Sequence, residues 1–139
     1  MRTIKFRGKR LDGEGWAYGY PLEKFQAIDA EPRIVIDTCR TFANDGYHSL
    51  EQYAVLPESV GQWTGLVDRH GKEIYEGDVL HRDFHQDMFA EFYKVAFCLV
   101  SCNPVQRANW SPVTCRGSDI IYREIIGNII DSPELMEVE

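Results

Sequence analysis

The stretch VGQWTGLVDRHGKEIYEGDVL, residues 60–80, decides the fold of this chain. Two apolar runs flank the turn Asp68-Arg69-His70-Gly71. An aspartate at the first turn position accepts backbone hydrogen bonds, and a glycine at the last position supplies a positive φ. We therefore predict a hairpin in this stretch, with its return strand over residues 72–74.

A second tight turn follows almost at once, at Tyr75-Glu76-Gly77-Asp78. It feeds residues 79–81, which read as the next strand. Two turns this close leave no room for a helix. Trp63 and Tyr75 are the large aromatic residues of this stretch, and we expect both in the core, where they would hold the hairpin against the sheet.

This stretch also carries a family resemblance. Residues 61–66, then Asp68 and residues 71–79, resemble the signature of the YopX family of phage and prophage proteins. Two further segments agree: residues 4–9 with 16–19 near the start, and residues 124–129 with 132–135 near the end. The resemblance implies a mainly β fold in two small parts, the second like an SH3-type barrel. It implies no activity, so no catalytic residue is carried over.

With 139 residues, the chain has room for one domain or two small ones. We place the boundary after Leu56. Residues 1–56 are predicted to be a β subdomain built on a hairpin, and residues 57–139 an SH3-like small barrel with a short C-terminal helix. Pro133 suits the first helical position, with Asp131 or Ser132 as the cap. No apolar run approaches the roughly 18 residues of a membrane span, and no signal-type block follows Met1, so we expect a cytoplasmic protein.

The first hairpin is predicted from alternation. Residues 3–9 place Ile4 and Phe6 on one face and the basic residues Lys5, Arg7 and Lys9 on a solvent-facing one. We expect the next strand to end at Pro21. Along it, the aromatic residues Trp16, Tyr18 and Tyr20, which we call the aromatic row, alternate with the small residues Ala17 and Gly19. We favour the aromatic row as the core face, packed on Ile4 and Phe6. The alternative is a platform that stacks bases or sugars.

The secondary structure of the second half is harder to predict from the sequence. Residues 90–100 alternate and are predicted to form one strand. Residues 103–117 contain two prolines and no clear period, so we expect a long connection, which Trp110 would anchor. Residues 119–130 are apolar on both faces and predict a strand covered on both sides, with a bulge at Gly127.

Candidate chemistry is sparse. The pairs His81/His85 and Cys98/Cys102 could supply zinc ligands, with Cys115 as a fifth. However, Cys98 lies inside a strand pattern, which does not bend around one ion, so we predict no metal and no cofactor. The sequence contains no hydrolase elbow, zinc-protease or phosphate-loop motif, and we predict a non-enzymatic protein. A Cys–His pair formed in space stays open as an alternative.

The net charge and its distribution along the chain indicate which kinds of partner the protein could bind. The net charge of −7 argues against a general nucleic-acid binder. The first ten residues are nevertheless basic and the tail is acidic, so the two could pair between copies. We predict a self-associating interaction module of a phage or prophage that binds an unidentified host or phage protein and no membrane. The alternative is a nucleic-acid-associated regulator that uses the basic first strand. Candidate contacts are Arg69, His70 and Lys72 at the hairpin tip, unless that turn is merely solvated, and Lys5, Arg7 and Lys9 on the first strand.

Overall fold

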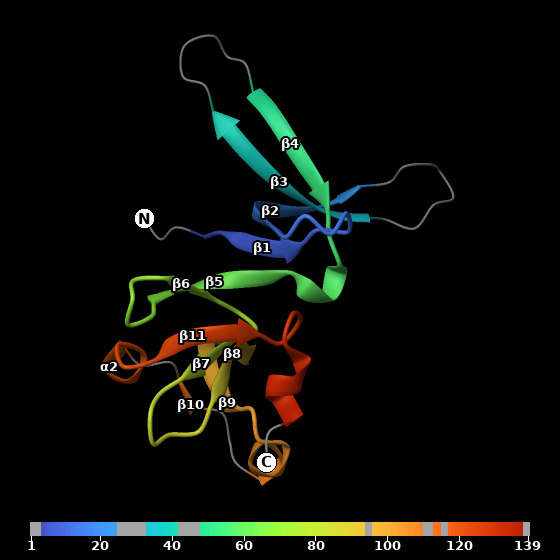
Figure 1. Cartoon of the computed structure of the whole chain (residues 1–139). Coiled ribbons are helices and arrows are strands. Elements are labelled where there is room, and N and C mark those ends of the chain that lie inside the picture. Colours follow the sequence, from blue (N-terminus) through green and yellow to red (C-terminus); the bar gives the residue numbers. More distant parts are fainter. Residues whose placement is uncertain are drawn as a thin grey trace. The chain divides into compact units, whose positions relative to one another are not determined.

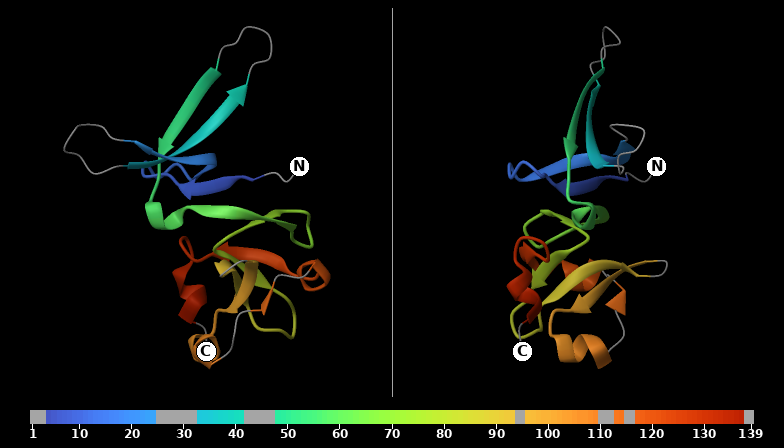
Figure 2. Two further views of the ribbon diagram at one scale, coloured as in Figure 1. Left: turned by 180° about the vertical axis from the view of Figure 1, so that it is seen from behind. Right: turned by 90° about the vertical axis from the view of Figure 1, so that its right-hand side faces the viewer.

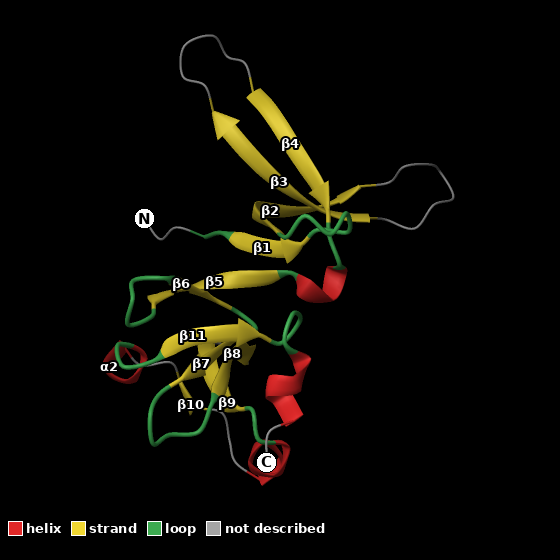
Figure 3. Ribbon diagram, viewed as in Figure 1, coloured by secondary structure: helices red, strands yellow, loops and turns green. Residues whose placement is uncertain are grey.

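The computed structural model describes residues 4–24, 33–41, 48–93, 96–109, 113–114 and 117–137. Strands dominate and helices are short, as Figure 3 shows, and the strands pair into antiparallel sheets. The prediction of a mainly β protein is confirmed. The chain divides into two compact units, residues 1–62 and 63–139. The SH3-like closure of the second unit stays a prediction.

The first unit is a twisted antiparallel sheet with the strand order β4-β3-β2-β1 (Figure 1). Gly61 and Gln62, at the start of β5 (Gly61–Val67), pair with the other side of β1. A single 3₁₀ turn, η1, precedes β5, and the Ser59 hydroxyl there accepts a hydrogen bond from the Lys9 amide. The elements are β1 Phe6–Lys9, β2 Trp16–Lys24, β3 Arg33–Thr41, β4 His48–Ala54 and η1 Pro57–Ser59.

The prediction that Pro21 ends the second strand is wrong, because β2 continues to Lys24. The pairing of β2 with β1 stops at Gly19, and from Tyr20 onward β2 pairs only with β3 among the described strands. Pro21 therefore lies where one side of the strand is free of ladder hydrogen bonds, which is where a residue without an N–H is tolerated in a sheet.

The predicted core face of the first hairpin is also wrong, since the small residues face inward. Ala17, Ile36 and Val55 form the buried cluster of this unit. A Cβ atom on Gly8 would come within 2.9 Å of the Val55 side chain, so the core occupies the space above the small face. Because Ala17 points inward, alternation along β2 directs Tyr18 outward.

The second unit holds a five-stranded antiparallel sheet with the order β10-β9-β8-β7-β11, which Figure 2 shows from two further sides. The rest of β5 pairs with β6. The strands after β5 are β6 Glu73–Tyr75, β7 Asp78–His81, β8 Met88–Tyr93, β9 Ala96–Ser101, β10 Val113–Thr114 and β11 Glu124–Asn128. The helices are α1 Pro104–Asn109, α2 Gly117–Ile120 and the 3₁₀ helix η2 Pro133–Glu137.

The central hairpin forms as predicted. Asp68 Oδ1 accepts hydrogen bonds from the amides of His70 and Lys72, and Gly71 has a φ of +79°. The second turn contains Gly77 at a φ of +87°. The predicted helix after Pro133 is present as η2.

Three predictions for the second half need correction. Residues 90–100 are not one strand but parts of β8 and β9, which pair with each other and so continue the alternation across a chain reversal. The predicted connection 103–117 contains α1 and β10. The predicted strand 119–130 is confined to β11, because α2 and a turn precede it, although the register shift beside Gly127 confirms the bulge.

Two buried clusters lie on either side of the second unit's sheet. Ile74 and Leu80 belong to the first cluster, and Val79 and Cys102 to the second. Tyr75 is buried, as expected, whereas Trp63 is only half-buried. Along the described residues, no helix combines the length and hydrophobicity that crossing a membrane requires. The predicted anchor Trp110 and the candidate fifth zinc ligand Cys115 lie outside the described residues.

Candidate functional site

One face of the first unit gathers aromatic and basic side chains. In the β1–β2 ladder, Arg7 lies directly opposite Tyr18, and Lys9 lies opposite Trp16. Residues directly opposite each other in an antiparallel pair project from the same face. We call this surface the aromatic–basic face; its members are Arg7, Lys9, Trp16, Tyr18 and Tyr20, with the half-buried Lys5 just before β1.

Arg7 anchors the aromatic–basic face rather than projecting into solvent. Its guanidinium carbon lies 4.5 Å from the centroid of the Trp16 ring, and the residue is only 7% exposed. A cation over an indole ring is stabilised by the ring quadrupole. The prediction of a solvent-facing Arg7 is therefore wrong: its face is outward, but Trp16 covers it.

The two tyrosines are the accessible part of the face. Tyr18 is 52% exposed and Tyr20 is 53% exposed. Alternation alone correctly groups them with Trp16, but it cannot tell which side of the strand the core will cover. The small residues Gly8 and Ala17 on the other face were the available signal, because small side chains permit close packing of a crossing strand.

The hairpin tip is less basic than its sequence indicates. Arg69 Nη2 lies 3.1 Å from Glu124 Oε2, and His70 Nε2 lies 3.2 Å from the same oxygen. Glu124 begins β11, more than fifty residues along the chain, so no local pattern could reveal it. Lys72 is exposed. The predicted cluster is assembled, but a carboxylate offsets part of its charge.

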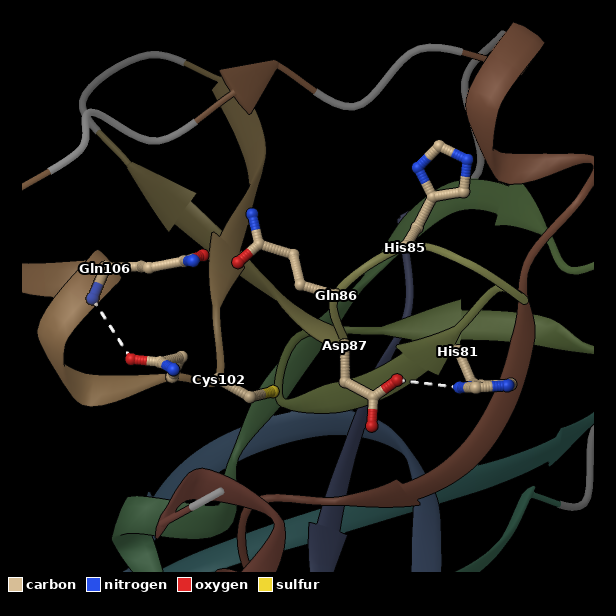
Figure 4. Close-up of a pocket in the computed structure, with 7 residues that line it drawn as sticks. His81, His85, Gln86, Asp87, Cys102 and Gln106 are labelled. Carbon is tan, nitrogen blue, oxygen red and sulfur yellow. Dashed lines mark hydrogen bonds and ion pairs between the residues drawn. The ribbon is translucent and has the colours of Figure 1, made fainter. Parts of the chain in front are cut away.

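The candidate metal ligands are only partly brought together. His81, His85 and Cys102 line one pocket of the second unit, along with Asp87 (Figure 4). Cys98 and Cys102 are both buried free thiols, and Cys98 is not among the residues that line this pocket. Over the described parts of the chain, no three His, Cys, Asp or Glu residues are placed to hold a metal ion.

Comparison with known proteins decides the family. The model of the family described as YopX protein matches residues 5–137, nearly the whole chain. The chain belongs to the YopX family. Among curated proteins, none matches it significantly.

A solved structure shares the fold of this YopX-family chain. It is protein EF1440 from Enterococcus faecalis, with a TM-score of 0.61 and 21% sequence identity. The match covers 99% of the chain studied and 100% of the EF1440 chain. At this identity, the likeness establishes the fold and nothing about the site.

His81 of the YopX-family chain is held by two carboxylates. Its Nδ1 lies 2.7 Å from Asp87 Oδ1, and its Nε2 lies 3.2 Å from Asp83 Oδ1. The hydrogen bond with Asp87 raises the pKa of His81 above its ordinary value; partial burial opposes this, and Asp83 adds to the rise. Both ring nitrogens therefore donate in the charged form.

We expect NMR titration of the His81 ring to give a pKa above 6.5, the ordinary value for histidine. Asp87→Asn should lower that pKa, since it removes the closer carboxylate. Because the folded-state pKa is raised, this contribution to stability is fully present below the ordinary pKa and disappears as the pH rises through the folded value. An unshifted His81 in the wild type would contradict the assignment.

Proposed function

We propose that this chain is a non-enzymatic interaction module of phage or prophage origin that associates with itself in the host cytoplasm. Its aromatic–basic face is the contact surface, and a second copy of the chain is the occupant. The exposure of Tyr18 and Tyr20 on a face that also carries cations is the observation on which the proposal rests.

The residue types on this face suit a protein interface. Tyrosine, tryptophan and arginine dominate the binding energy of known interfaces, because they combine a large apolar area with a polar group. The Arg7–Trp16 stack already holds two of them rigidly. A rigid aromatic surface loses little conformational entropy when a partner covers it.

Charge complementarity supports a second copy as that partner. The first 62 residues carry eight Lys and Arg against nine Asp and Glu. Residues 63–139 carry seven against thirteen. The cations of one copy's aromatic–basic face would therefore meet a strongly acidic unit in another copy, including its tail from Asp131 onward. Such an arrangement steers association and makes it dependent on salt.

The described side chains offer poor catalytic groups, which supports a binding role. Burial raises the pKa of the Cys102 thiol to about 11, so it is protonated at neutral pH. A protonated thiol is a weak nucleophile. A carboxylate lies within hydrogen-bond distance of each His81 ring nitrogen, so neither nitrogen faces a substrate.

Light scattering after gel filtration tests self-association. We expect a multimer at about 50 mM salt that weakens at about 500 mM, because ions screen exposed charges. The double variant Tyr18→Ser/Tyr20→Ser should raise the dissociation constant at least thirtyfold, about 2 kcal/mol, as loss of hot-spot aromatics does. Leu11→Ser is the matched control, since Leu11 is 54% exposed in the same unit but lies in the turn before β2. A monomer at both salt concentrations would refute self-association.

A nucleic-acid-associated regulator is the second candidate, favoured by the register that places Lys9 beside Trp16 on the face that exposes Tyr18 and Tyr20. Cations along the backbone with aromatic rings under the bases are how single strands are bound without sequence preference. A gel shift with single-stranded DNA and RNA at low salt separates the two. Binding that the Tyr18→Ser/Tyr20→Ser variant loses would favour this candidate, whereas no shift supports the first.

A further inference from the structure

The second unit contains a pocket of about 520 Å³, a volume within the roughly 300–1,000 Å³ of small-molecule sites. It is lined by the end of β7, the loop 82–87, the turn after β9 and helix α1. All but one of its lining residues are polar: His81, His85, Gln86, Asp87, Asn103 and Gln106, with Cys102. These side chains offer donors and acceptors to a polar ligand.

Hydrogen bonds to backbone carbonyls hold the walls of the pocket in place. Arg123 Nη1 donates to the Gln86 carbonyl at 3.1 Å, and the Cys102 amide donates to the Asp87 carbonyl at 3.0 Å. These bonds hold the loop even though Phe84, at its tip, has a φ of +63°, which is costly for a residue other than glycine. The pocket is thus part of the folded framework.

The same framework decides which groups face the pocket unpaired. Gln86 Oε1 accepts a hydrogen bond from the Ser101 hydroxyl at 2.7 Å, and Asn103 Oδ1 accepts from the amides of Val105 and Gln106. The carbonyl oxygens of both side chains are therefore occupied. Their amide NH₂ groups have no partner among the described residues and are the donors of the site.

Two acceptors complement these donors. Gln106 Oε1 is buried and has no hydrogen-bond partner among the described residues. Figure 4 shows the Gln106 amide directed toward Gln86. Asp87 Oδ1 lies 2.7 Å from His81 Nδ1, and Figure 4 shows the other Asp87 oxygen directed away from the His81 ring. A buried acceptor without a donor costs about 1–3 kcal/mol, so a ligand that donates to Gln106 would recover that energy.

We infer that this pocket binds a small neutral polyhydroxylated molecule, such as a free sugar or a cyclic polyol. Each hydroxyl both donates and accepts, so a polyol can match both the NH₂ donors and the acceptor oxygens of this pocket. The carboxylates of Asp83 and Asp87 disfavour an anion. The His81 ring lies within hydrogen-bond distance of both carboxylates and so takes up part of their capacity to attract a cation. The inference does not depend on self-association of the chain.

The test uses the full chain and two probes, myo-inositol and D-ribose, with adenine and zinc chloride as comparators. We expect saturable amide shifts in NMR spectra, confined to residues 81–87 and 102–106, with either polyol. Gln106→Met should weaken binding about tenfold because it removes the buried acceptor. The same variant should leave the melting temperature of the free protein unchanged or raise it, which a merely structural glutamine would not do.

The matched control is Gln52→Met, the same substitution at a half-buried glutamine of the first unit. It should bind the polyols as the wild type does. If Gln106→Met melts at a lower temperature, Gln106→Asn, which withdraws the amide by one methylene group, serves in its place. The inference is overturned by unsaturable or absent shifts with both polyols, by shifts with adenine or zinc alone, or by undiminished binding in both Gln106 variants.

Discussion

Arg123→Met is expected to lower the free energy of unfolding by about 3–5 kcal/mol, because several acceptors of a buried guanidinium lose their donor, at about 1–3 kcal/mol each. Arg123 is 3% exposed. Its Nε donates to Asp119 at 2.8 Å, and its Nη1 donates to the carbonyls of Gln86 and Leu80. Methionine matches part of the volume and supplies none of these donors. Urea denaturation followed by tryptophan fluorescence measures the loss.

Arg82→Met is the matched control for Arg123, because Arg82 donates to the same carboxylate, at 2.9 Å. The Arg82 side chain is 32% exposed, so the expected loss is below about 1 kcal/mol. Arg123→Lys should fall between the two, since an ammonium keeps the charge but cannot reproduce the planar fork. Equal losses in the Arg82 and Arg123 variants would show that burial does not set the cost.

Asp68→Ala is expected to lower the free energy of unfolding by about 3 kcal/mol, because several amides lose a charged acceptor. Asp68 Oδ1 accepts from the amides of His70 and Lys72, and Oδ2 accepts from the Ile125 amide at 3.1 Å. A hydrogen bond to a charged group contributes about 1.5–3 kcal/mol, and part of that is offset as exposed amides return to water. Asp12→Ala is the control, since Asp12 also accepts an amide hydrogen bond in a hairpin turn but its side chain is 49% exposed.

The Asp68 carboxylate also predicts how stability responds to acid. Burial raises its pKa, but the amides of Ile125, Lys72 and His70 together lower it further, so the net pKa lies below the ordinary value. A depressed carboxylate stabilises the fold above its ordinary pKa, and that contribution is lost as the pH falls through the folded value. Asp68→Ala should therefore unfold with a flatter pH dependence below about pH 4 than the wild type. If the variant and the wild type lost stability equally steeply in acid, the Asp68 carboxylate would not be the group responsible.

The turns were predictable because their chemistry is local. Asp68 and Gly71 specify a reversal through their own backbone preferences, and Gly77 specifies the next one. The same holds for Pro133 at the start of η2. The prediction of one strand over residues 90–100 failed because the alternation of side chains continues across a chain reversal. The segments β8 and β9 therefore look like one strand in the sequence. The prediction that Pro21 ends the strand failed because a proline disrupts a strand only where its missing N–H would have bonded to a neighbouring strand.

The candidate sites also combine local features, which the sequence predicts, with long-range contacts, which it does not. The sequence grouped Trp16, Tyr18 and Tyr20 on one side of a strand, but Val55 and Ile36, packed against Gly8 and Ala17, decide that this side faces outward. No sequence pattern near Arg69 or His70 predicts their contact with Glu124. Likewise, no pattern near Gln86 predicts that Gln106 lines the same pocket.

By itself, then, the sequence determined the mainly β class, the central double turn and the kinship with the YopX family, because each depends on neighbouring residues. Only the tertiary structure decided which face of β2 is buried, which carboxylate pairs with the hairpin tip and which amides meet in the pocket. These outcomes depend on contacts between residues far apart in the chain, and pairwise packing over such separations leaves no periodic trace in the sequence.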